Sequence, residues 1–163
     1  MTAHISDTVE MLAELIHGNV ANEGRLRDAA KVADEPMNQQ LLRYMADQRS
    51  ELADELQAHA ASFGRVPDAE PTLVDKFSRT VTKIRGVVTS DQTEMLLEKA
   101  AECEVDLRDE YRKALSDEHV ALSVKDVLNR QLAETGDYSV MIQKIEKDER
   151  IIRASRVHSQ QSG

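Results

Sequence analysis

Apolar residues recur at intervals of three and four positions along four long stretches of this chain, and that spacing limits the folds it can adopt. Side chains three or four positions apart lie on the same side of an α-helix, so each stretch predicts one amphipathic helix. Only six glycines and three prolines occur in 163 residues, which favours long helices over sheets with their frequent turns. The four apolar stripes run from Ile5 to Ala33, from Met37 to Phe63, from Leu97 to Ala114 and from Val127 to Ile152.

Turn and capping residues divide these stripes into two pairs. Pro36 suits the first turn of the second helix, and Gly64 suits the position just after its end. Residues 64–90 contain the stretch GRVPDAEPT and a shorter apolar stripe around Phe77 and Ile84, so we expect a long crossover that carries a short extra helix. Two helical hairpins joined by one crossover predict an all-α four-helix bundle.

The length of the chain fits a single domain with one core, and two independent cores would be cramped. We expect that domain over residues 1–157. A flexible tail is expected at 158–163, because SQQSG is too small and polar to pack.

Charge and cysteine content exclude several kinds of partner. The net charge of -9 argues against nucleic-acid binding, because phosphate binding draws on clustered Lys and Arg. The N-terminus lacks the basic and apolar regions of a signal peptide, and no apolar run approaches the roughly 18 residues of a membrane span. Cys103 is the only cysteine, so no internal disulfide can form. We expect a cytoplasmic protein without nucleic-acid or membrane partners.

Polar residues interrupt the apolar stripes at corresponding places. The motif E-x-x-L-R-D begins at Glu23 and again at Glu104, and a Q-x-x-E pair occurs at 48–51 and again at 131–134. Side chains three positions apart share a helix face, so these groups predict an internal duplication around a polar layer. The candidate metal ligands are Glu23, Glu51, Glu104 and Glu134, and the candidate core-layer residues are Asn19, Gln48 and Gln131.

This layout, one glutamate on the first and third helices and an i,i+3 pair on the second and fourth, resembles that of ferritin-like di-iron carboxylate proteins. Over residues 8–150 the chain also resembles a bacterial family of ferritin-like, rubrerythrin-type four-helix bundles of unknown function. The likeness is carried by NEGRLRDAA, MADQRSELADELQ, AECEVDLRDEYRKAL and RQLAE. The resemblance implies a ferritin-like fold and a stress-related role, and it implies no particular reaction.

The chain departs from the di-iron pattern because both histidine ligands are missing. Where E-x-x-H pairs are needed, it has Gln48 with Glu51 and Gln131 with Glu134. A register shifted by one residue would place Arg49 and Leu52 at the positions on the second helix, which is worse for a metal. An all-oxygen site would suit Mn, Mg or Ca better than iron chemistry that relies on imidazole.

The repeated glutamates also have a simpler interpretation. Each has an arginine four residues later, Arg27 after Glu23 and Arg108 after Glu104, and such pairs occur in ordinary helices. A carboxylate that faces the core must find an arginine, share a proton or bind a cation. An arginine held against these glutamates would exclude the metal site.

These observations favour a non-catalytic binding or structural module with degenerate di-iron ligands and no cofactor. Two alternatives stay open at this point. One is a metal-binding protein or oxidoreductase with a carboxylate-bridged Fe or Mn centre. The other is a homo-oligomeric bundle that binds a partner through an exposed stripe.

Overall fold

The computed structural model describes residues 2–64 and 90–162, and both stretches are almost entirely helical. No strand occurs in these two stretches, so the prediction of an all-α protein is confirmed. The helices are α1 (Thr2–Val32), α2 (Pro36–Ser62), α4 (Ser90–Ser116), α5 (Leu122–Glu134) and α6 (Tyr138–Gln161).

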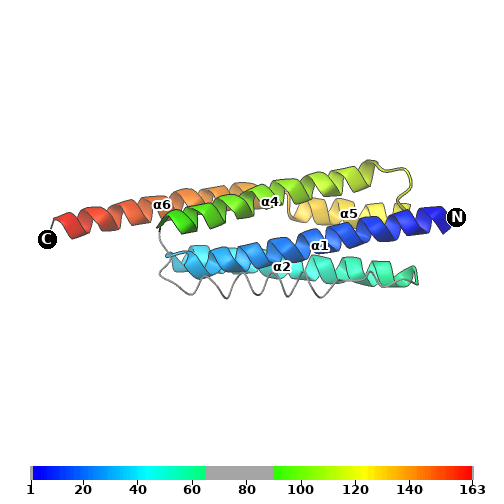
Figure 1. The fold of residues 1–163 in the computed structure, drawn as a ribbon, viewed down its shortest axis with the longest axis horizontal. Coiled ribbons are helices and arrows are strands. Elements are labelled where there is room, and N and C mark those ends of the chain that lie inside the picture. Colours follow the sequence, from blue (N-terminus) through cyan, green and yellow to red (C-terminus); the bar gives the residue numbers. More distant parts are fainter. Residues whose placement is uncertain (1, 65–89, 163) are drawn as a thin grey trace.

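The five helices form a bundle with four positions (Figure 1). A tight turn joins α1 to α2 in one antiparallel hairpin, and α4 with α5 and α6 makes the second hairpin. The hairpins meet where α1 packs along α4 and where α2 contacts α6. The chain directions of α2 and α4 are the same, so the end of α2 and the start of α4 lie at opposite ends of the bundle (Figure 1).

Most of the predicted crossover falls outside the described residues. Gly64 is described and has a φ of 77°, the left-handed conformation that a glycine adopts after a helix end. The predicted helix cap at Gly64 is therefore confirmed, as is Pro36 in the first turn of α2. The extra helix expected around Phe77 and Ile84 lies in residues 65–89 and stays a prediction.

The fourth position of the bundle is divided between α5 and α6, whereas the sequence predicted one long helix there. The break covers Thr135 to Asp137. Gly136 weakens helix formation at this point, and the Thr135 hydroxyl donates to the Gln131 carbonyl at 2.9 Å. The amide of Tyr138 donates to the Thr135 carbonyl at 3.2 Å, which closes a turn before α6 begins.

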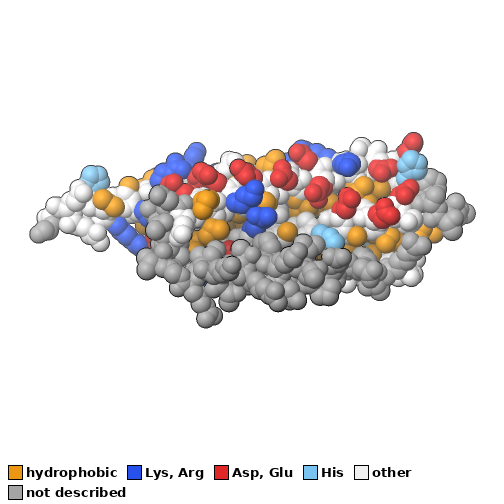
Figure 2. Space-filling view, viewed as in Figure 1, with side chains coloured by type: hydrophobic (Ala, Val, Ile, Leu, Met, Phe, Trp, Pro, Cys, Tyr) orange, Lys and Arg blue, Asp and Glu red, His pale blue; other side chains and the backbone are white. Residues whose placement is uncertain are grey.

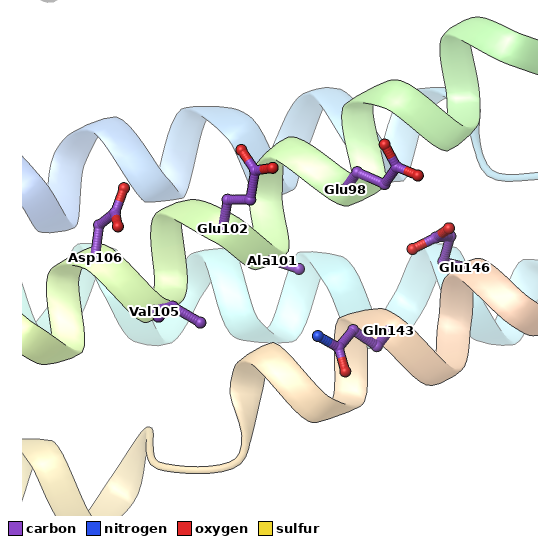
Figure 3. Close-up of a pocket in the computed structure, with 7 residues that line it drawn as sticks. All are labelled: Glu98, Ala101, Glu102, Val105, Asp106, Gln143 and Glu146. Carbon is purple, nitrogen blue, oxygen red and sulfur yellow. The ribbon is translucent and has the colours of Figure 1, made fainter.

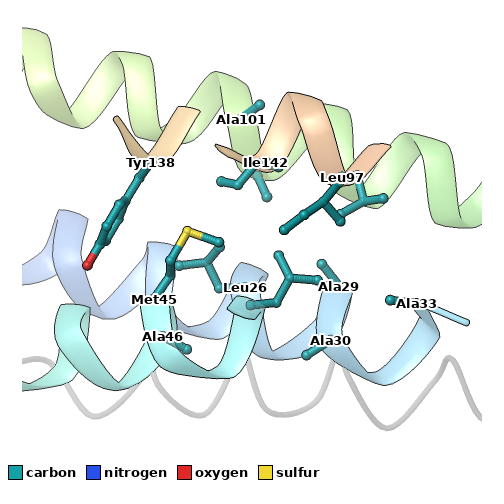
Figure 4. Close-up of a cluster of buried hydrophobic side chains, with 13 residues drawn as sticks. Leu26, Ala29, Ala30, Ala33, Met45, Ala46, Leu97, Ala101, Tyr138 and Ile142 are labelled. Carbon is teal, nitrogen blue, oxygen red and sulfur yellow. The ribbon is translucent and has the colours of Figure 1, made fainter. Parts of the chain in front are cut away.

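The core consists of two apolar clusters that are separated along the bundle by a layer of polar side chains. Figure 4 shows the first cluster, with Tyr138 and Met45 at one end of it. The second cluster is built around Tyr111 and the leucines of α1, α2, α4 and α5 at the other end of the bundle. The buried residues of the first are Leu26, Ala29, Ala30, Ala33, Leu42, Met45, Ala46, Leu97, Ala100, Ala101, Tyr138, Ile142 and Ile145, and those of the second are Leu12, Leu15, Ile16, Leu56, Ala60, Leu107, Tyr111, Ala114, Val120, Val124 and Leu128.

A buried carboxylate of α6 caps the start of α2. Glu149 accepts hydrogen bonds from the backbone amides of Asp34 and Glu35, at 2.8 and 3.0 Å. It also accepts one from the Asn38 side chain at 3.0 Å. Amide groups at a helix start have no partner within the helix and carry partial positive charge, so an acceptor from a distant helix satisfies them. Glu149 thereby ties the first hairpin to the second.

The last part of α6 projects past the other helices (Figure 1). The helix continues to Gln161, so most of the segment expected as a tail is helical. Its side chains from Ala154 onward are exposed. Within residues 2–64 and 90–162, none of the helices has the length and apolar content needed to cross a membrane.

The cap on α2 makes Glu149 a testable contributor to stability. Glu149→Ala is expected to lower the free energy of unfolding by about 2–3 kcal/mol, because buried donors lose a charged acceptor. Denaturant unfolding measures the change. Glu118→Ala, which removes an exposed carboxylate, should stay within about 0.5 kcal/mol. Equal effects of the two variants would contradict the capping role.

Candidate functional site

The centre of the polar layer is an ion pair between Arg49 of α2 and Glu104 of α4. The Arg49 side chain is 2% exposed and the Glu104 side chain is also 2% exposed. Two nitrogens of the guanidinium group meet the two carboxylate oxygens: Nε donates to Oε1 at 3.1 Å, and a terminal nitrogen donates to Oε2. This fork geometry is the strongest form of a salt bridge between side chains.

Side chains of the other helices complete the hydrogen bonds of this pair. Asn19 accepts a hydrogen bond from the remaining terminal nitrogen of Arg49 at 3.0 Å. Asn22 donates to Glu104 Oε1 at 3.2 Å. The ring of Tyr138 lies with its centroid 5.5 Å from the guanidinium carbon of Arg49, within range of a cation–π interaction. The charges are therefore buried with partners on every side.

From Asn19 the network continues through the bundle toward the surface. The Asn19 amide donates to the Tyr111 hydroxyl at 2.8 Å, and that hydroxyl donates to Gln131 Oε1 at 2.7 Å. The Gln131 amide in turn lies 3.3 Å from Glu55 Oε2. Glu55 pairs with Arg130, which also holds Glu134 at 3.1 Å. One chain of polar contacts thus joins α1, α2, α4 and α5.

The two tyrosines beside the pair are kept neutral by their surroundings. Burial raises the pKa of Tyr111 to about 12, although the hydrogen bond from Asn19 acts in the opposite direction. Burial likewise raises the pKa of Tyr138 to about 12. A phenolate at either position would lie near the Glu104 carboxylate, which further disfavours ionisation.

The four glutamates predicted as metal ligands are not brought together. Glu104 is buried against Arg49, whereas Glu51 and Glu134 are exposed on α2 and α5. Glu23 lies at the edge of the bundle and pairs with Arg27 at 2.9 Å, as the i,i+4 interpretation predicted. Glu104 makes no such pair with Arg108. Of the predicted quartet, one carboxylate is buried in the layer and the other three lie outside it.

Two of the three predicted layer residues occupy the layer. Asn19 and Gln131 are fully buried in the network. Gln48 is half-buried, and its amide lies 3.4 Å from the exposed Glu51. The alternative register, with Arg49 in place of Gln48, is the one that the structure adopts.

The sequence analysis preferred Gln48 to Arg49 and missed Asn22, because the spacing allows two adjacent positions at each place. Gln48 and Arg49 both lie three or four positions from Met45 and Leu52. Among the buried residues of α2, the large side chains from Leu42 to Leu56 advance alternately by three and four positions, a frame that includes Arg49 and not Gln48. The same alternation selects Asn22 over Glu23 in α1. The useful signal is this alternation of three and four positions among the buried residues of each helix. In α2 they are Leu42, Met45, Arg49, Leu52 and Leu56, and in α1 they are Leu12, Leu15, Asn19, Asn22 and Leu26.

The described side chains offer few reactive groups. In the described parts of the chain, no cluster of three or more His, Cys, Asp or Glu residues is arranged to hold a metal ion. Cys103 is half-buried, and burial raises the pKa of its thiol, which keeps it protonated. The layer is closed, charged and hydrogen-bonded, an arrangement suited to fixing helix positions rather than to binding a substrate.

A groove of about 310 Å³ lies on the outside of the bundle between α4 and α6 (Figure 3). Ala101 and Val105 supply its apolar surface, and Gln143 lines it from α6. Glu146 also comes from α6 and pairs with Arg150 at 2.7 Å. Four carboxylates line the groove, those of Glu98, Glu102, Asp106 and Glu146.

A family model described as a domain of unknown function, DUF2383, matches residues 7–117, which is more than half of the chain. The chain therefore belongs to this family, and the expectation of a family of unknown function is confirmed. The matched part includes both Arg49 and Glu104, whereas Gln131 and Tyr138 lie beyond its end. The curated proteins yield no match to the sequence.

Breaking the buried pair should be costly. Glu104→Ala is expected to lower the free energy of unfolding by about 3–5 kcal/mol, because Arg49 would stay buried without its counter-charge. Replacing both charges, in Arg49→Met with Glu104→Leu, should recover most of that loss. Glu118→Ala is the control, because it removes an exposed carboxylate outside the layer, with an expected change within about 0.5 kcal/mol. Denaturant unfolding in which Glu104→Ala behaves like the control would contradict the pair's role.

The neutral tyrosines predict how stability changes at high pH. The folded-state pKa of Tyr111 is about 12, above the ordinary value of 10.0, so the folded protein holds a proton that the unfolded chain releases. Stability is therefore full below pH 10 and falls as the pH rises from 10.0 toward about 12. Unfolding measured across this range should show the decline, and it should be shallower in Tyr111→Phe. Stability that rises in this range would contradict the assignment.

Proposed function

We propose that this member of the DUF2383 family is a ferritin-like bundle in which an arginine side chain replaces the metal centre. The guanidinium group of Arg49 supplies the positive charge that buried carboxylates require. The protein then acts as a non-catalytic binding or structural module, in the stress-related setting that the resemblance implies. The observation that carries the proposal is the buried, bidentate pair of Arg49 and Glu104.

The ligand chemistry supports this proposal. A di-iron carboxylate site uses groups from all four helices around two cations. At the corresponding level of this bundle the buried groups are two asparagines, one glutamine, one arginine and a single carboxylate, Glu104. Amides are weak ligands, and a guanidinium repels metal cations. A hydrogen-bonded layer of this kind can fix helix register, as polar groups in bundle cores are known to do.

The arrangement of the described helices supports the ferritin-like part of the proposal. Ferritin-like folds join two antiparallel hairpins by one long connection. Here α2 and α4 run in the same direction, with the end of one and the start of the other at opposite ends of the bundle (Figure 1). Residues 65–89 connect them. A short turn could not do so, because α2 has 27 residues and is about 40 Å long at 1.5 Å per residue.

The proposal is tested by metal analysis of protein expressed with iron and manganese and purified without chelator. We expect the wild-type protein to contain well below one metal ion per chain, with the same content in Glu104→Ala and Glu102→Ala. The Arg49 charge should exclude cations from Glu104. Stoichiometric metal in the wild type that is lost in Glu104→Ala but kept in Glu102→Ala would contradict the proposal. That result would favour the carboxylate metal centre instead.

A further inference from the structure

The outward faces of α4 and α6 expose large apolar side chains at regular positions. On α4, Met95 is 61% exposed and Val105 is 44% exposed. On α6, Val140 is 47% exposed and Ile151 is 65% exposed. On α6 the two apolar residues are eleven positions apart, three turns, so both lie on the same side. On α4 they are ten positions apart, so Val105 lies about 80° around the helix from Met95, where it lines the groove between α4 and α6. The two helices are neighbours in the bundle and together form one surface, the α4/α6 face.

Between the apolar positions, exposed carboxylates lie on α4 beside Lys99, and exposed lysines lie on α6 beside Glu146 and Asp148. Glu98 and Glu102 are exposed on α4, three and seven positions after Met95. Lys144 and Lys147 are exposed on α6, four and seven positions after Val140. Figure 2 shows carboxylates gathered over α4 and the neighbouring part of α1. The acidic character of α4 continues beyond Glu102, since Asp106 and Asp109 are also exposed.

The unlike charges lie at the same level along the bundle. Arg150 of α6 bonds Glu94 of α4 at 2.8 Å, which fixes the two antiparallel helices in register. Glu98 and Glu146 line the same groove, and Lys147 follows Glu146 directly. Met95 consequently lies near the level of Ile151. Counting away from this point along both helices brings Val105 to the level of Val140.

We infer that the α4/α6 face binds a second copy of this chain, with the two-fold axis parallel to the helices. This rotation exchanges the sides of the face, so α4 of each copy lies over α6 of the other at the same level. Glu98 and Glu102 then meet Lys147 and Lys144 of the other copy. The two charge contacts form twice, once on each side of the axis.

The apolar positions close both ends of each charged stretch. In the same arrangement, Met95 packs on Ile151 and Val105 packs on Val140. A two-fold axis across the helices would instead place α4 on α4, with carboxylates facing carboxylates, and like charges at an interface are costly. The contacts of Glu98 and Glu102 with the lysines of the other copy therefore favour the parallel axis, although this axis also brings the carboxylates of the two grooves toward each other.

The size of the face is set by the stretch over which α4 and α6 lie side by side. In the register fixed by Glu94 and Arg150, residues 90–106 of α4 lie beside residues 138–154 of α6. At 1.5 Å per residue and about 10 Å per helix width, this stretch measures about 25 by 20 Å, roughly 500 Å², which is less than the roughly 800 Å² that each partner buries in a standard interface and suits a weak, reversible dimer. The inference rests on the proposed function in that it names the partner of the binding module. It uses only exposed residues, so its test is separate from that of the buried pair.

Sedimentation equilibrium of the full chain tests the inference. The wild type is expected to form dimers. The variant Lys144→Glu, Lys147→Glu and the variant Glu98→Lys, Glu102→Lys should each raise the dimer Kd by about 100-fold or more, because both symmetric contacts become repulsive. An equimolar mixture of the two variants should dimerise like the wild type. In the mixed pair, each reversed helix meets a reversed helix and each native helix meets a native one.

The matched control reverses two exposed charges on the other hairpin, Lys31→Glu with Arg43→Glu, and should leave the dimer Kd unchanged. Circular dichroism of every variant checks that the helices are retained. A monomeric wild type overturns the inference. So does a dimer that survives either reversal, or a pair of folded variants that stay monomeric when mixed. Metal content is measured independently, so failure of the dimer leaves the proposal for Arg49 and Glu104 standing.

Discussion

The buried pair of Arg49 and Glu104 is the interaction on which the rest of the bundle depends. Taking a guanidinium and a carboxylate out of water is expensive, and the cost is offset only when both groups are fully paired. Here Asn19, Asn22 and Tyr138 supply the remaining contacts, from α1 and α6. A shift of any one helix along its axis would leave a charge or an amide without a partner. The pair thereby fixes the relative positions of helices that apolar packing alone would let slide.

The pair also gives the two apolar clusters their boundary. Both clusters draw on α1, α2 and α4, with α6 completing the first and α5 the second, and leucine and alanine occur in both. The polar layer permits one alignment of the helices, because each buried hydrogen-bond donor must lie opposite its acceptor on another helix. On this account a buried polar layer between two apolar clusters has a structural explanation in its ion pair. The family match includes both charged residues of the layer, and Gln131 and Tyr138 are added by the helices that follow it.

Much of this fold could be predicted from the sequence, because long amphipathic stripes, Pro36 and Gly64 have direct physical meaning for helices. The site could be predicted only in part. Neighbouring positions such as 48 and 49 both satisfy a spacing of three or four. Both hold polar residues, so polarity does not show which of the two is buried. Gln48 was predicted for the layer because it repeats the Q-x-x-E spacing of Gln131 and Glu134. The partner that makes the burial of Arg49 possible, Glu104, lies on another helix and cannot be found from local spacing.

Nitrogen NMR of the arginine side chains tests the central claim most directly. A guanidinium group held in the core by two carboxylate oxygens should give an Nε–H signal that exchanges slowly with water. The account predicts such a signal for Arg49, absent in Arg49→Lys and shifted in Glu104→Gln. If no slowly exchanging arginine signal disappears in Arg49→Lys, Arg49 is not buried against Glu104, and the account of this bundle is contradicted.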